Sequence, residues 1–280
     1  MPALSPFSLT ALEAARAAGE IHRSLFGGIL RVEYKGRHDP VTEADRAAEA
    51  AIVRTLRDAY PDHAFLGEEG GQQGEAAHLW LIDPLDGTFN YTRGIPWFAV
   101  SIALEHRGRP VAGVILNTMY GEVYVAEAGR GAYAAWTRDL PQAPSAWGDL
   151  SRWRRLHVSA TARLDQATLS TGFPNSVAET RLNLDHFTNL LLAAAKIRAM
   201  GSAALSLAAV ALGQTEGYWE IGPNVWDLAA GSLLVEEAGG RVTDLRGRPL
   251  NSRGRQILAT NGGIHDEVVA VLARARSGLE

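Results

Sequence analysis

The segment Trp-Leu-Ile-Asp-Pro-Leu-Asp-Gly-Thr at residues 80–88 constrains this chain more than any other part of it. Its apolar residues end at Asp83-Pro84, which is typical of a buried strand reaching its carboxyl end. Asp83 and Asp86 then project from one tight turn, where two carboxylates repel each other unless a cation lies between them. Gly87-Thr88 offers backbone N–H groups to a phosphate if a helix begins there. The segment predicts adjoining metal and phosphate sites, although Asp-Pro and Asp-Gly are also ordinary turn dipeptides.

The composition is that of a globular protein, with 280 residues, 46% hydrophobic and 21% charged. The net charge of -4 gives no general attraction to nucleic acid or to an anionic membrane. Cysteine is absent, which excludes disulfides, thiolate nucleophiles and cysteine-ligated metal sites. The first residues do not resemble a signal peptide, and no apolar run is long enough to span a membrane. The expected location is therefore the cytoplasm.

One basic run surrounds an aromatic residue, at Arg152-Trp153-Arg154-Arg155. Such a run can contact nucleic acid or a protein partner. No second basic patch supports that interpretation here, so we expect a solvated loop.

Hydrophobic periodicity predicts alternating runs of strands and helices. We expect helices over 8–26, with Thr10 and Glu13 in capping-box spacing, and over 43–60, 179–199, 203–212, 225–238 and 264–276. We expect strands near 64–66, 97–105, 110–116, 122–126, 132–136, 168–171, 218–220, 241–243 and 256–259. Residues 137–152 resemble a surface loop between two packed halves, 1–150 and 151–280, of a single unit. This order favours a layered α/β or α+β sandwich.

Three further segments place an acid at a strand end or a helix start. Asp45 follows Thr42 with capping-box spacing, Glu68 follows a short strand, and Asp227 opens an apolar helix. Taken singly, a helix cap, an exposed loop acid and a residue favoured by the helix dipole explain them. Taken together, they occupy the places where α/β folds build sites. Carboxylates without His or Cys companions suit Mg²⁺ or Mn²⁺.

Motifs of other chemistries are missing from the sequence. The eight histidines show no zinc-ligand spacing. No Walker loop is present and no G-x-G-x-x-G follows a strand, so neither nucleoside triphosphates nor dinucleotides are supported. The absence of G-x-S-x-G weakens a serine hydrolase interpretation.

Four blocks resemble the signature of the inositol monophosphatase family. They are Val-Thr-Glu-Ala-Asp at 41–45, Gly-Glu-Glu at 67–69, the segment 80–88, and Trp-Asp-Leu-Ala-Ala-Gly at 226–231. Their order and separations are those of the family, and residues 201–204 and 236–240 extend the resemblance to nearly the whole chain. The resemblance implies an α-β-α-β-α layered sandwich, a homodimer, and Mg²⁺-dependent, Li⁺-sensitive hydrolysis of phosphate monoesters.

The resemblance also implies how the metal ions are held. Glu68, Asp83 and the Leu85 carbonyl would bind a first Mg²⁺, and Asp83, Asp86 and Asp227 a second. Glu68 would help to bind a third ion, and Mn²⁺ could substitute for Mg²⁺.

By the same resemblance, Asp45, Thr88 and Glu68 take part in catalysis. Thr88 with Asp45 would orient and deprotonate the attacking water, and the N–H groups of Gly87 and Thr88 would cradle the phosphate. The expected reaction is direct attack of an activated water with no covalent intermediate.

The substrate pocket is implied less completely. Glu220 corresponds to an acid that contacts substrate hydroxyls, although a solvent-facing acid after a strand is the ordinary alternative. The other residues expected there are Asp86, Gly201, Ser202, Ala203 and Asp227, with Arg198 and the turn 172–174 lining the same cleft. Ala134-Ala135-Trp136 departs from the Asn-Gly common in relatives, which leaves this edge less defined.

We expect the substrate to be a small phosphate ester, inositol monophosphate or a related sugar phosphate. Phe89-Asn90-Tyr91 and Glu220 favour inositol monophosphate. Similar sites serve fructose-1,6-bisphosphate, histidinol phosphate, NADP and 3′-phosphoadenosine 5′-phosphate. An alternative of another class is an RNA-binding or transcription-complex protein with residual phosphatase activity, favoured by the run 152–155 alone.

Overall fold

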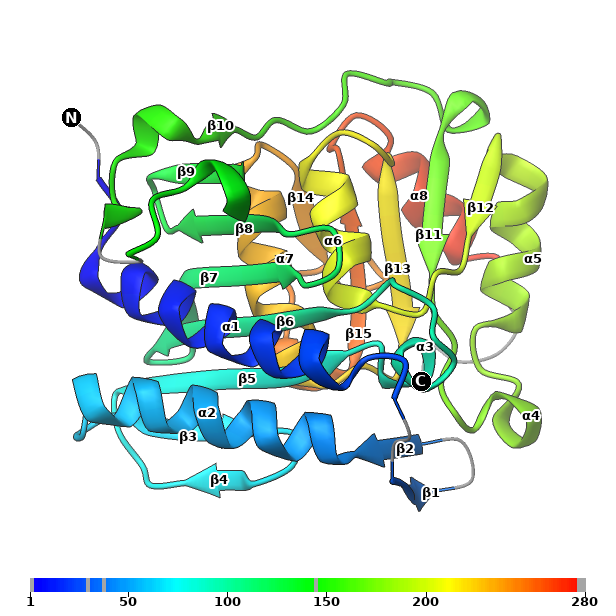
Figure 1. Ribbon diagram of the computed structural model, residues 1–280. Coiled ribbons are helices and arrows are strands. Elements are labelled where there is room, and N and C mark those ends of the chain that lie inside the picture. Colours follow the sequence, from blue (N-terminus) through cyan, green and yellow to red (C-terminus); the bar gives the residue numbers. More distant parts are fainter. Residues whose placement is uncertain (1–2, 29–30, 37–38, 144–145, 276–280) are drawn as a thin grey trace.

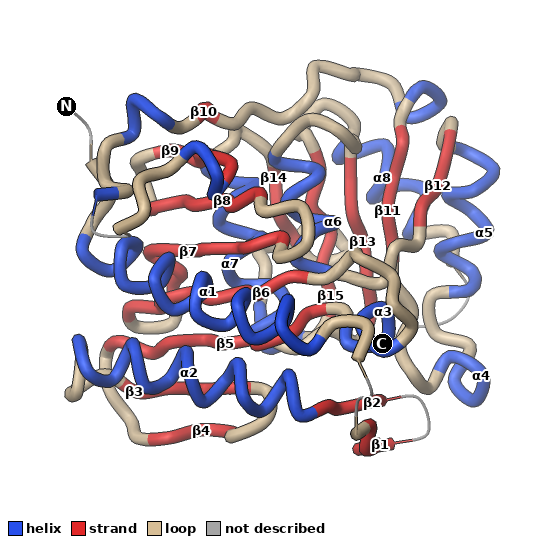
Figure 2. The backbone as a smooth tube through the Cα atoms, viewed as in Figure 1, coloured by secondary structure: helices blue, strands red, loops and turns tan. Residues whose placement is uncertain are grey.

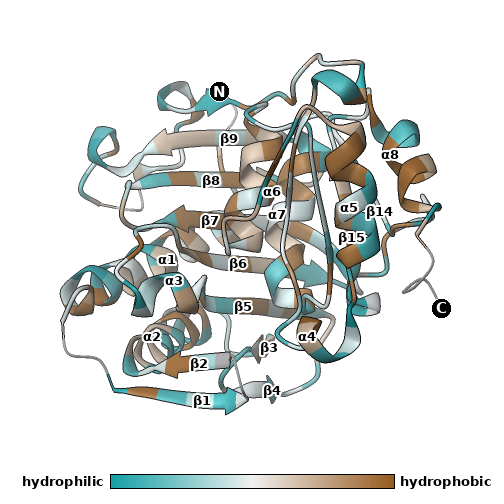
Figure 3. Cartoon of the chain, turned by 90° about the vertical axis from the view of Figure 1, so that its right-hand side faces the viewer, coloured by the Kyte–Doolittle hydropathy of each residue, from teal (hydrophilic) through white to brown (hydrophobic). Residues whose placement is uncertain are grey.

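The computed structural model describes residues 3–28, 31–36, 39–143 and 146–275. These residues form five layers in the order α-β-α-β-α, as predicted (Figure 1). Figure 3 views the molecule from the side, where the two sheets lie on either side of a central pair of helices. Among the described helices, none combines the length and the apolar character that a membrane crossing requires.

The larger sheet has eight strands in the order β10-β9-β8-β7-β6-β5-β3-β4. Its strands run antiparallel to their neighbours, except that β3 lies parallel to β5. The carboxyl ends of β3 and β5 therefore lie side by side at the same end of the two strands. The strands are β3 (Ala64–Gly67), β4 (Gly71–Gln73), β5 (His78–Asp86), β6 (Ala99–His106), β7 (Arg109–Asn117), β8 (Glu122–Glu127), β9 (Gly131–Trp136) and β10 (Arg154–Arg155).

Two helices, α1 (Pro6–Leu25) and α2 (Glu43–Ala59), cover one face of this sheet. Leu12 and Ile52 pack there against Trp80 in one apolar core. The predicted capping box at Thr10 and Glu13 is wrong, because the helix already begins at Pro6. Its cap is Ser5, whose hydroxyl accepts from the Ser8 N–H at 3.3 Å. The capping box of Thr42 and Asp45 at the start of α2 is confirmed.

The central helices α6 (Ala203–Ala211) and α7 (Val225–Glu237) pack between the two sheets. A helix that is buried on all sides carries apolar residues around its whole circumference, as α6 does with Leu205 and Leu207. The second sheet lies beyond them, and its strands run crosswise to those of the first in Figure 2. Its strands, in spatial order, are β12 (Lys196–Arg198), β11 (Thr168–Thr171), β13 (Gly217–Ile221), β15 (Gln256–Thr260) and β14 (Arg241–Thr243). Helices α5 (Leu184–Ala193) and α8 (His265–Leu272) cover its outer face.

The predicted long helix over 179–199 is wrong. The chain forms a single turn, α4 (Val177–Thr180), and starts again at α5. Arg181 and Asn183 separate the two with left-handed φ angles of 55° and 69°, which a helix cannot contain. Residues 196–198 form β12, a short strand parallel to β11 at the edge of the second sheet.

Several short elements were not predicted. A hairpin of β1 (Val32–Gly36) and β2 (Asp39–Thr42) precedes α2, and α3 (Thr88–Thr92) follows β5. Single-turn 3-10 helices occur at η1 (Thr137–Asp139), η3 (Leu150–Arg152), η4 (Leu164–Gln166) and η5 (Ser252–Gly254). These elements are too short for hydrophobic periodicity to reveal them.

The described part of the loop 137–152 is packed structure and not an open linker. Trp147 is buried, and the Leu4 N–H donates to the Gly148 carbonyl at 3.0 Å. The basic run beside the loop is only partly solvated, because Trp153 is buried and Arg154 pairs with Glu122. The strand β10 joins the larger sheet although it lies beyond the expected boundary at residue 150.

Candidate active site

The two acids of the segment 80–88 share one face of the larger sheet because β5 contains an extra residue. Asp83 pairs with Ser101 of β6, and Asp86 pairs with Ala99, so three steps on β5 match two on β6. In a regular strand, residues three apart point to opposite faces. The β-bulge at residues 84–85 therefore turns Asp86 to the side of Asp83, the face on which α7 packs.

Glu68 joins these acids through the parallel pairing of β3 and β5. It follows the last residue of β3, and its N–H donates to the Ile82 carbonyl at 3.2 Å. The carboxylate lines the same cavity as Asp83 and Asp86. Its Oε1 accepts from the Lys35 ammonium of β1 at 2.8 Å.

Asp227 of α7 (Val225–Glu237) completes the cluster. It lies in the first turn of α7, as the sequence predicts, and its Oδ2 accepts from the Asn224 N–H at 2.7 Å. The first turn of α7 lies at the cavity wall, so the helix presents this acid to the ends of β3 and β5. Four carboxylates from three separate segments thus line one cavity.

Burial and mutual repulsion make these acids hold their protons tightly. Burial raises the pKa values of Asp83 and Asp227 well above the ordinary value, and the neighbouring carboxylates raise them further. Burial raises the pKa of Asp86 to about 6, although hydrogen bonds from Ser202, Ala203 and Ala204 partly oppose this. A divalent cation would relieve such repulsion, and an all-oxygen donor set suits Mg²⁺ or Mn²⁺. The residues present therefore fit a metal of this class.

The four carboxylates are not arranged as a complete coordination shell for a metal ion. In the described ranges, no group of three or more His, Asp or Glu side chains is arranged to hold an ion. Asp86 instead accepts from the N–H groups of Ala203 and Ala204, at 3.1 and 2.8 Å, and from the Ser202 hydroxyl. Glu68 is paired with Lys35. To bind a metal ion, Asp86 and Glu68 must either use their remaining lone pairs beside these hydrogen bonds or give up some of these donors.

Asp45 and Thr88 form a separate pair beside the acids. The Thr88 hydroxyl lies 2.9 Å from Asp45 Oδ1 and 2.9 Å from the Leu85 carbonyl. Asp45 Oδ2 accepts from the Thr42 N–H and hydroxyl at 2.8 and 2.6 Å. Burial is the largest effect on the Asp45 carboxyl and raises its pKa to about 6.

A helix does begin after Gly87, as the phosphate interpretation of this segment requires, because α3 starts at Thr88. Gly87 has a φ of 99°, and a Cβ there would lie 3.1 Å from the carbonyls of both Gly201 and Trp97. Only glycine fits such a position without strain. The first N–H groups of a helix have no acceptor within the helix, so they are available to an anion.

The cavity between these elements has a volume of about 490 Å³. Asp45 lies behind Thr88 and does not line it, and Arg198 does not line it either. The predicted residues that do line it are Glu68, Asp83, Leu85, Asp86, Gly87, Thr88, Gly172, Phe173, Pro174, Gly201, Ser202, Ala203, Glu220 and Asp227.

Glu220 faces the cavity with a partner that the sequence interpretation missed. The Tyr218 hydroxyl donates to Glu220 Oε2, and both residues line the cavity. Burial raises the pKa of Glu220 to about 7. The Tyr-x-Glu spacing is the available signal, since alternate residues of a strand share a face. Arg255, whose guanidinium donates to the Gly222 carbonyl, also lines the cavity and had no such signal.

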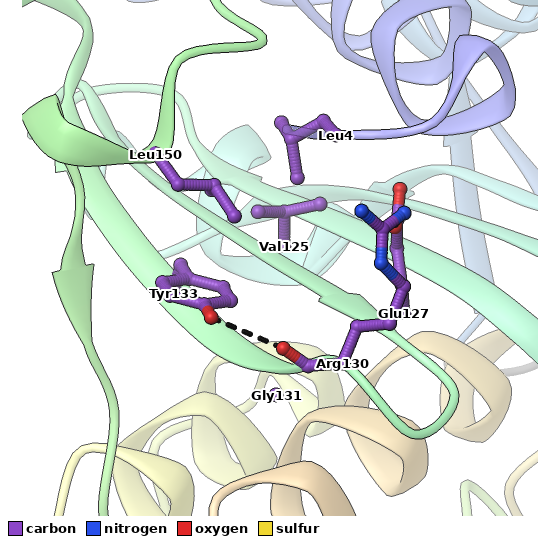
Figure 4. A pocket seen from close by; sticks show the side chains of 7 residues that line it. All are labelled: Leu4, Val125, Glu127, Arg130, Gly131, Tyr133 and Leu150. Carbon is purple, nitrogen blue, oxygen red and sulfur yellow. Dashed lines mark hydrogen bonds and ion pairs between the residues drawn. The ribbon is translucent and has the colours of Figure 1, made fainter. Parts of the chain in front are cut away.

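A smaller cavity of about 230 Å³ lies at the opposite end of the larger sheet, between the first residues of the chain and the turn joining β8 to β9 (Figure 4). Leu4, Val125 and Leu150 make most of its wall apolar. Its acid, Glu127, already accepts from the Ser5 N–H and is paired with Arg130. A cavity whose charges are neutralised within the protein does not match the predicted metal and phosphate chemistry.

Known proteins share this fold and much of this sequence. The sequence model of the inositol monophosphatase family matches residues 3–277. The chain is 41% identical to an inositol-1-monophosphatase of Synechocystis, over 97% of this chain and 92% of that protein. It is 45% identical to the Nus factor SuhB of Pseudomonas aeruginosa, over 87% of each chain. The solved structure of the extragenic suppressor protein suhB from Bartonella henselae matches with a TM-score of 0.86 and 39% identity, covering 96% of this chain and 99% of that one.

Proposed function

The chain belongs to the inositol monophosphatase family, whose members are metal-dependent phosphatases, and from that premise we propose that it hydrolyses inositol monophosphate or a related sugar phosphate using Mg²⁺. The observation that carries the proposal is the bulge in β5. It places Asp83 and Asp86 on one face, with Glu68 and Asp227 beside them. The first turn of α3 lines the same cavity, so an anion bound there would lie next to the acids.

The metal ligands we propose are those that the resemblance implies. Glu68, Asp83 and the Leu85 carbonyl would hold one Mg²⁺, Asp83, Asp86 and Asp227 would hold a second, and Glu68 would contribute to a third. When bound, such ions neutralise phosphoryl oxygens, lower the pKa of water and stabilise the leaving oxygen. Mn²⁺ carries the same charge and prefers the same ligand atoms, so it should substitute.

Thr88 and Asp45 supply the path for the proton of the attacking water. The Thr88 hydroxyl has a single hydrogen but two acceptors at equal distance, Asp45 and the Leu85 carbonyl. When Asp45 is ionised, Thr88 can donate to it and accept from the water. When Asp45 takes up a proton, it donates to Thr88, and Thr88 donates to Leu85. A pKa of about 6 leaves Asp45 mostly ionised at neutral pH, ready to accept that proton.

The substrate would lie between the first turn of α3 and Glu220. The N–H groups of Gly87 and Thr88 would bind the phosphate, and Glu220 would accept from hydroxyl groups of the sugar or inositol ring. Gly201, Ser202 and Ala203 would border the ring at the start of α6. A polyol matches this wall because its hydroxyls can donate to a carboxylate and accept from backbone amides.

A phosphate-release panel tests the proposal. The candidate substrates are inositol 1-phosphate, fructose-1,6-bisphosphate, histidinol phosphate, NADP and 3′-phosphoadenosine 5′-phosphate, each with Mg²⁺, with Mn²⁺ and with EDTA. We expect metal-dependent release that is fastest with inositol 1-phosphate and is inhibited by Li⁺. An enzyme that released phosphate from none of these esters in either metal would contradict the proposed function.

Asp45→Asn should lower kcat by about 100-fold, as expected for the loss of a general base. Asn keeps the shape of the side chain but cannot accept the proton. In the wild type, kcat should fall below about pH 6, because Asp45 then becomes protonated. A kcat–pH profile measured at saturating Mg²⁺ should lose this acidic limb in the variant. An unchanged limb would assign it to another group.

A second role is suggested by relatives named as Nus factors. The run 152–155 is a weaker basic patch than its sequence suggests, since Trp153 is buried and Arg154 pairs with Glu122. We therefore propose phosphate-ester hydrolysis as the first function of this protein, ahead of a role in a transcription complex. A cytoplasmic homodimer remains part of the proposal, and light scattering of the purified protein checks its dimeric state.

A further inference from the structure

Glu49 is a buried carboxylate that the proposed reaction does not use. It lies on α2 with 5% of its surface exposed. It follows Asp45 by four residues, and residues four apart lie on the same face of a helix. Burying a carboxylate is costly unless hydrogen bonds replace its water. The partners of Glu49 therefore indicate its role.

Both oxygens of Glu49 bind the turn that carries Glu68. The Glu69 N–H donates to Oε2 at 2.9 Å, and the Gly70 N–H donates to Oε1 at 2.6 Å. These are the two amides that directly follow Glu68, between β3 and β4. The carboxylate of Glu49 thus holds the main chain immediately beside a proposed metal ligand.

Glycines on both sides of this turn make room for the carboxylate. A Cβ at Gly67 would lie 2.5 Å from the carboxyl carbon of Glu49, and a Cβ at Gly70 would lie 2.6 Å from its Oε1. Neither glycine has a left-handed φ. Space, and not backbone conformation, therefore favours glycine at both positions while the Glu49 carboxylate lies there.

We propose that Glu49 is a positioning residue that holds the turn of Glu68 in place for metal binding, an inference that rests on the proposed function. One face of α2 carries both Asp45, bonded to Thr88, and Glu49, bonded to the turn. The rigid helix therefore sets the position of Glu68 relative to the Asp45–Thr88 pair. Groups that orient metal ligands typically change metal affinity or activity by 10- to 100-fold when they are removed.

Glu49→Gln tests this role while keeping the shape of the side chain. We expect the Mg²⁺ concentration for half-maximal rate to rise by about tenfold. At saturating Mg²⁺, kcat and the KM for substrate should stay near wild-type values, because Glu49 does not line the substrate cavity. Electron paramagnetic resonance titration with Mn²⁺, without substrate, should show the same loss of affinity.

Two comparisons separate the hydrogen bonds from other effects. Asp58→Asn removes an exposed acid from the same helix and should leave Mn²⁺ affinity unchanged. Gly67→Ala should weaken Mn²⁺ binding, because its Cβ strikes the carboxylate. Adding Gly67→Ala to Glu49→Ala should cost much less than Gly67→Ala alone, since the space is then free. If Glu49→Gln does not fold, Gly67→Ala, which keeps the native carboxylate, is titrated in its place.

A melting temperature lowered by Glu49→Gln, with Mn²⁺ affinity and Mg²⁺ half-saturation at wild-type values, would show a purely structural role and overturn the inference. Failure of the proposed function has a different signature. In that case the wild type releases no phosphate from any ester, whereas the Mn²⁺ titrations still decide what Glu49 does.

Discussion

Asp83→Asn should abolish phosphate release, with kcat/KM lower by at least about 1,000-fold, equivalent to about 4 kcal/mol of transition-state stabilisation. Asp83 is the residue that we propose as a ligand to two ions, so its loss disturbs both. The substitution keeps the size of the side chain, and its oxygen can still accept from the Leu85 N–H, 3.0 Å from Asp83 Oδ1. The fold should therefore survive, which circular dichroism and thermal melting would check.

Glu75→Gln is the matched control for this variant. Glu75 is an exposed acid between β4 and β5, so its substitution removes one negative charge from the connection that precedes β5. Its rate should equal that of the wild type. Activity of Asp83→Asn within tenfold of wild type would refute the proposed metal bridge, whereas binding of a protein partner that stays intact in this variant would point to the second candidate function.

The acids of the site were predictable because each has a local signal. Asp45 and Asp227 occupy first turns of helices, where capping explains their positions without tertiary information. Asp83 and Glu68 follow apolar runs that end abruptly. The parallel pairing of β3 with β5 brings the ends of these two runs together. The family resemblance did not indicate this pairing, but it implied that these acids share one metal site.

The features that were missed depend on contacts between distant segments or on single backbone angles. No local pattern marks the left-handed Arg181 and Asn183, so apolar residues on both sides resembled one long helix. The bulge in β5 appears only in its register with β6. Lys35 reaches Glu68 from a hairpin that lacks an apolar pattern. Glu49 did have a signal, its spacing of four from Asp45, but its importance emerges only with the glycines of the facing turn.

Mg²⁺ should stabilise the protein more strongly as the pH rises, because the same acids must lose their protons to bind it. The folded-state pKa values of Asp83 and Asp227 are raised well above their unfolded values, and that of Glu220 is raised to about 7. The folded state therefore binds more protons than the unfolded state at pH values between the unfolded and the folded pKa values of these groups. Without metal, the free energy of unfolding should fall as the pH rises from 7 to 8.5.

Buried histidines determine the lowest pH at which this fall in the free energy of unfolding should be seen. Burial lowers the pKa values of His22 to about 3 and of His265 to about 4. These two groups therefore make the free energy of unfolding rise with pH, and the rise is complete above their unfolded pKa of 6.5. Between pH 7 and 8.5 the carboxyl groups dominate. With 10 mM Mg²⁺, we expect the melting temperature at pH 8 to rise by about 5 °C over that in EDTA, and by less than half as much at pH 6.

Differential scanning fluorimetry of the wild type and of Asp227→Asn measures this linkage. Asp227→Asn removes a carboxyl group whose pKa is raised, so the variant should have a higher melting temperature than the wild type in EDTA at pH 8. It also removes a proposed metal ligand, so Mg²⁺ should raise its melting temperature only slightly. Glu13→Gln, at an exposed position of α1, should follow the wild type at every pH. A Mg²⁺ effect that did not depend on pH would mean that the ion binds away from these acids. Because the melting curves need no substrate, they test the metal site even if the physiological ester is none of those proposed.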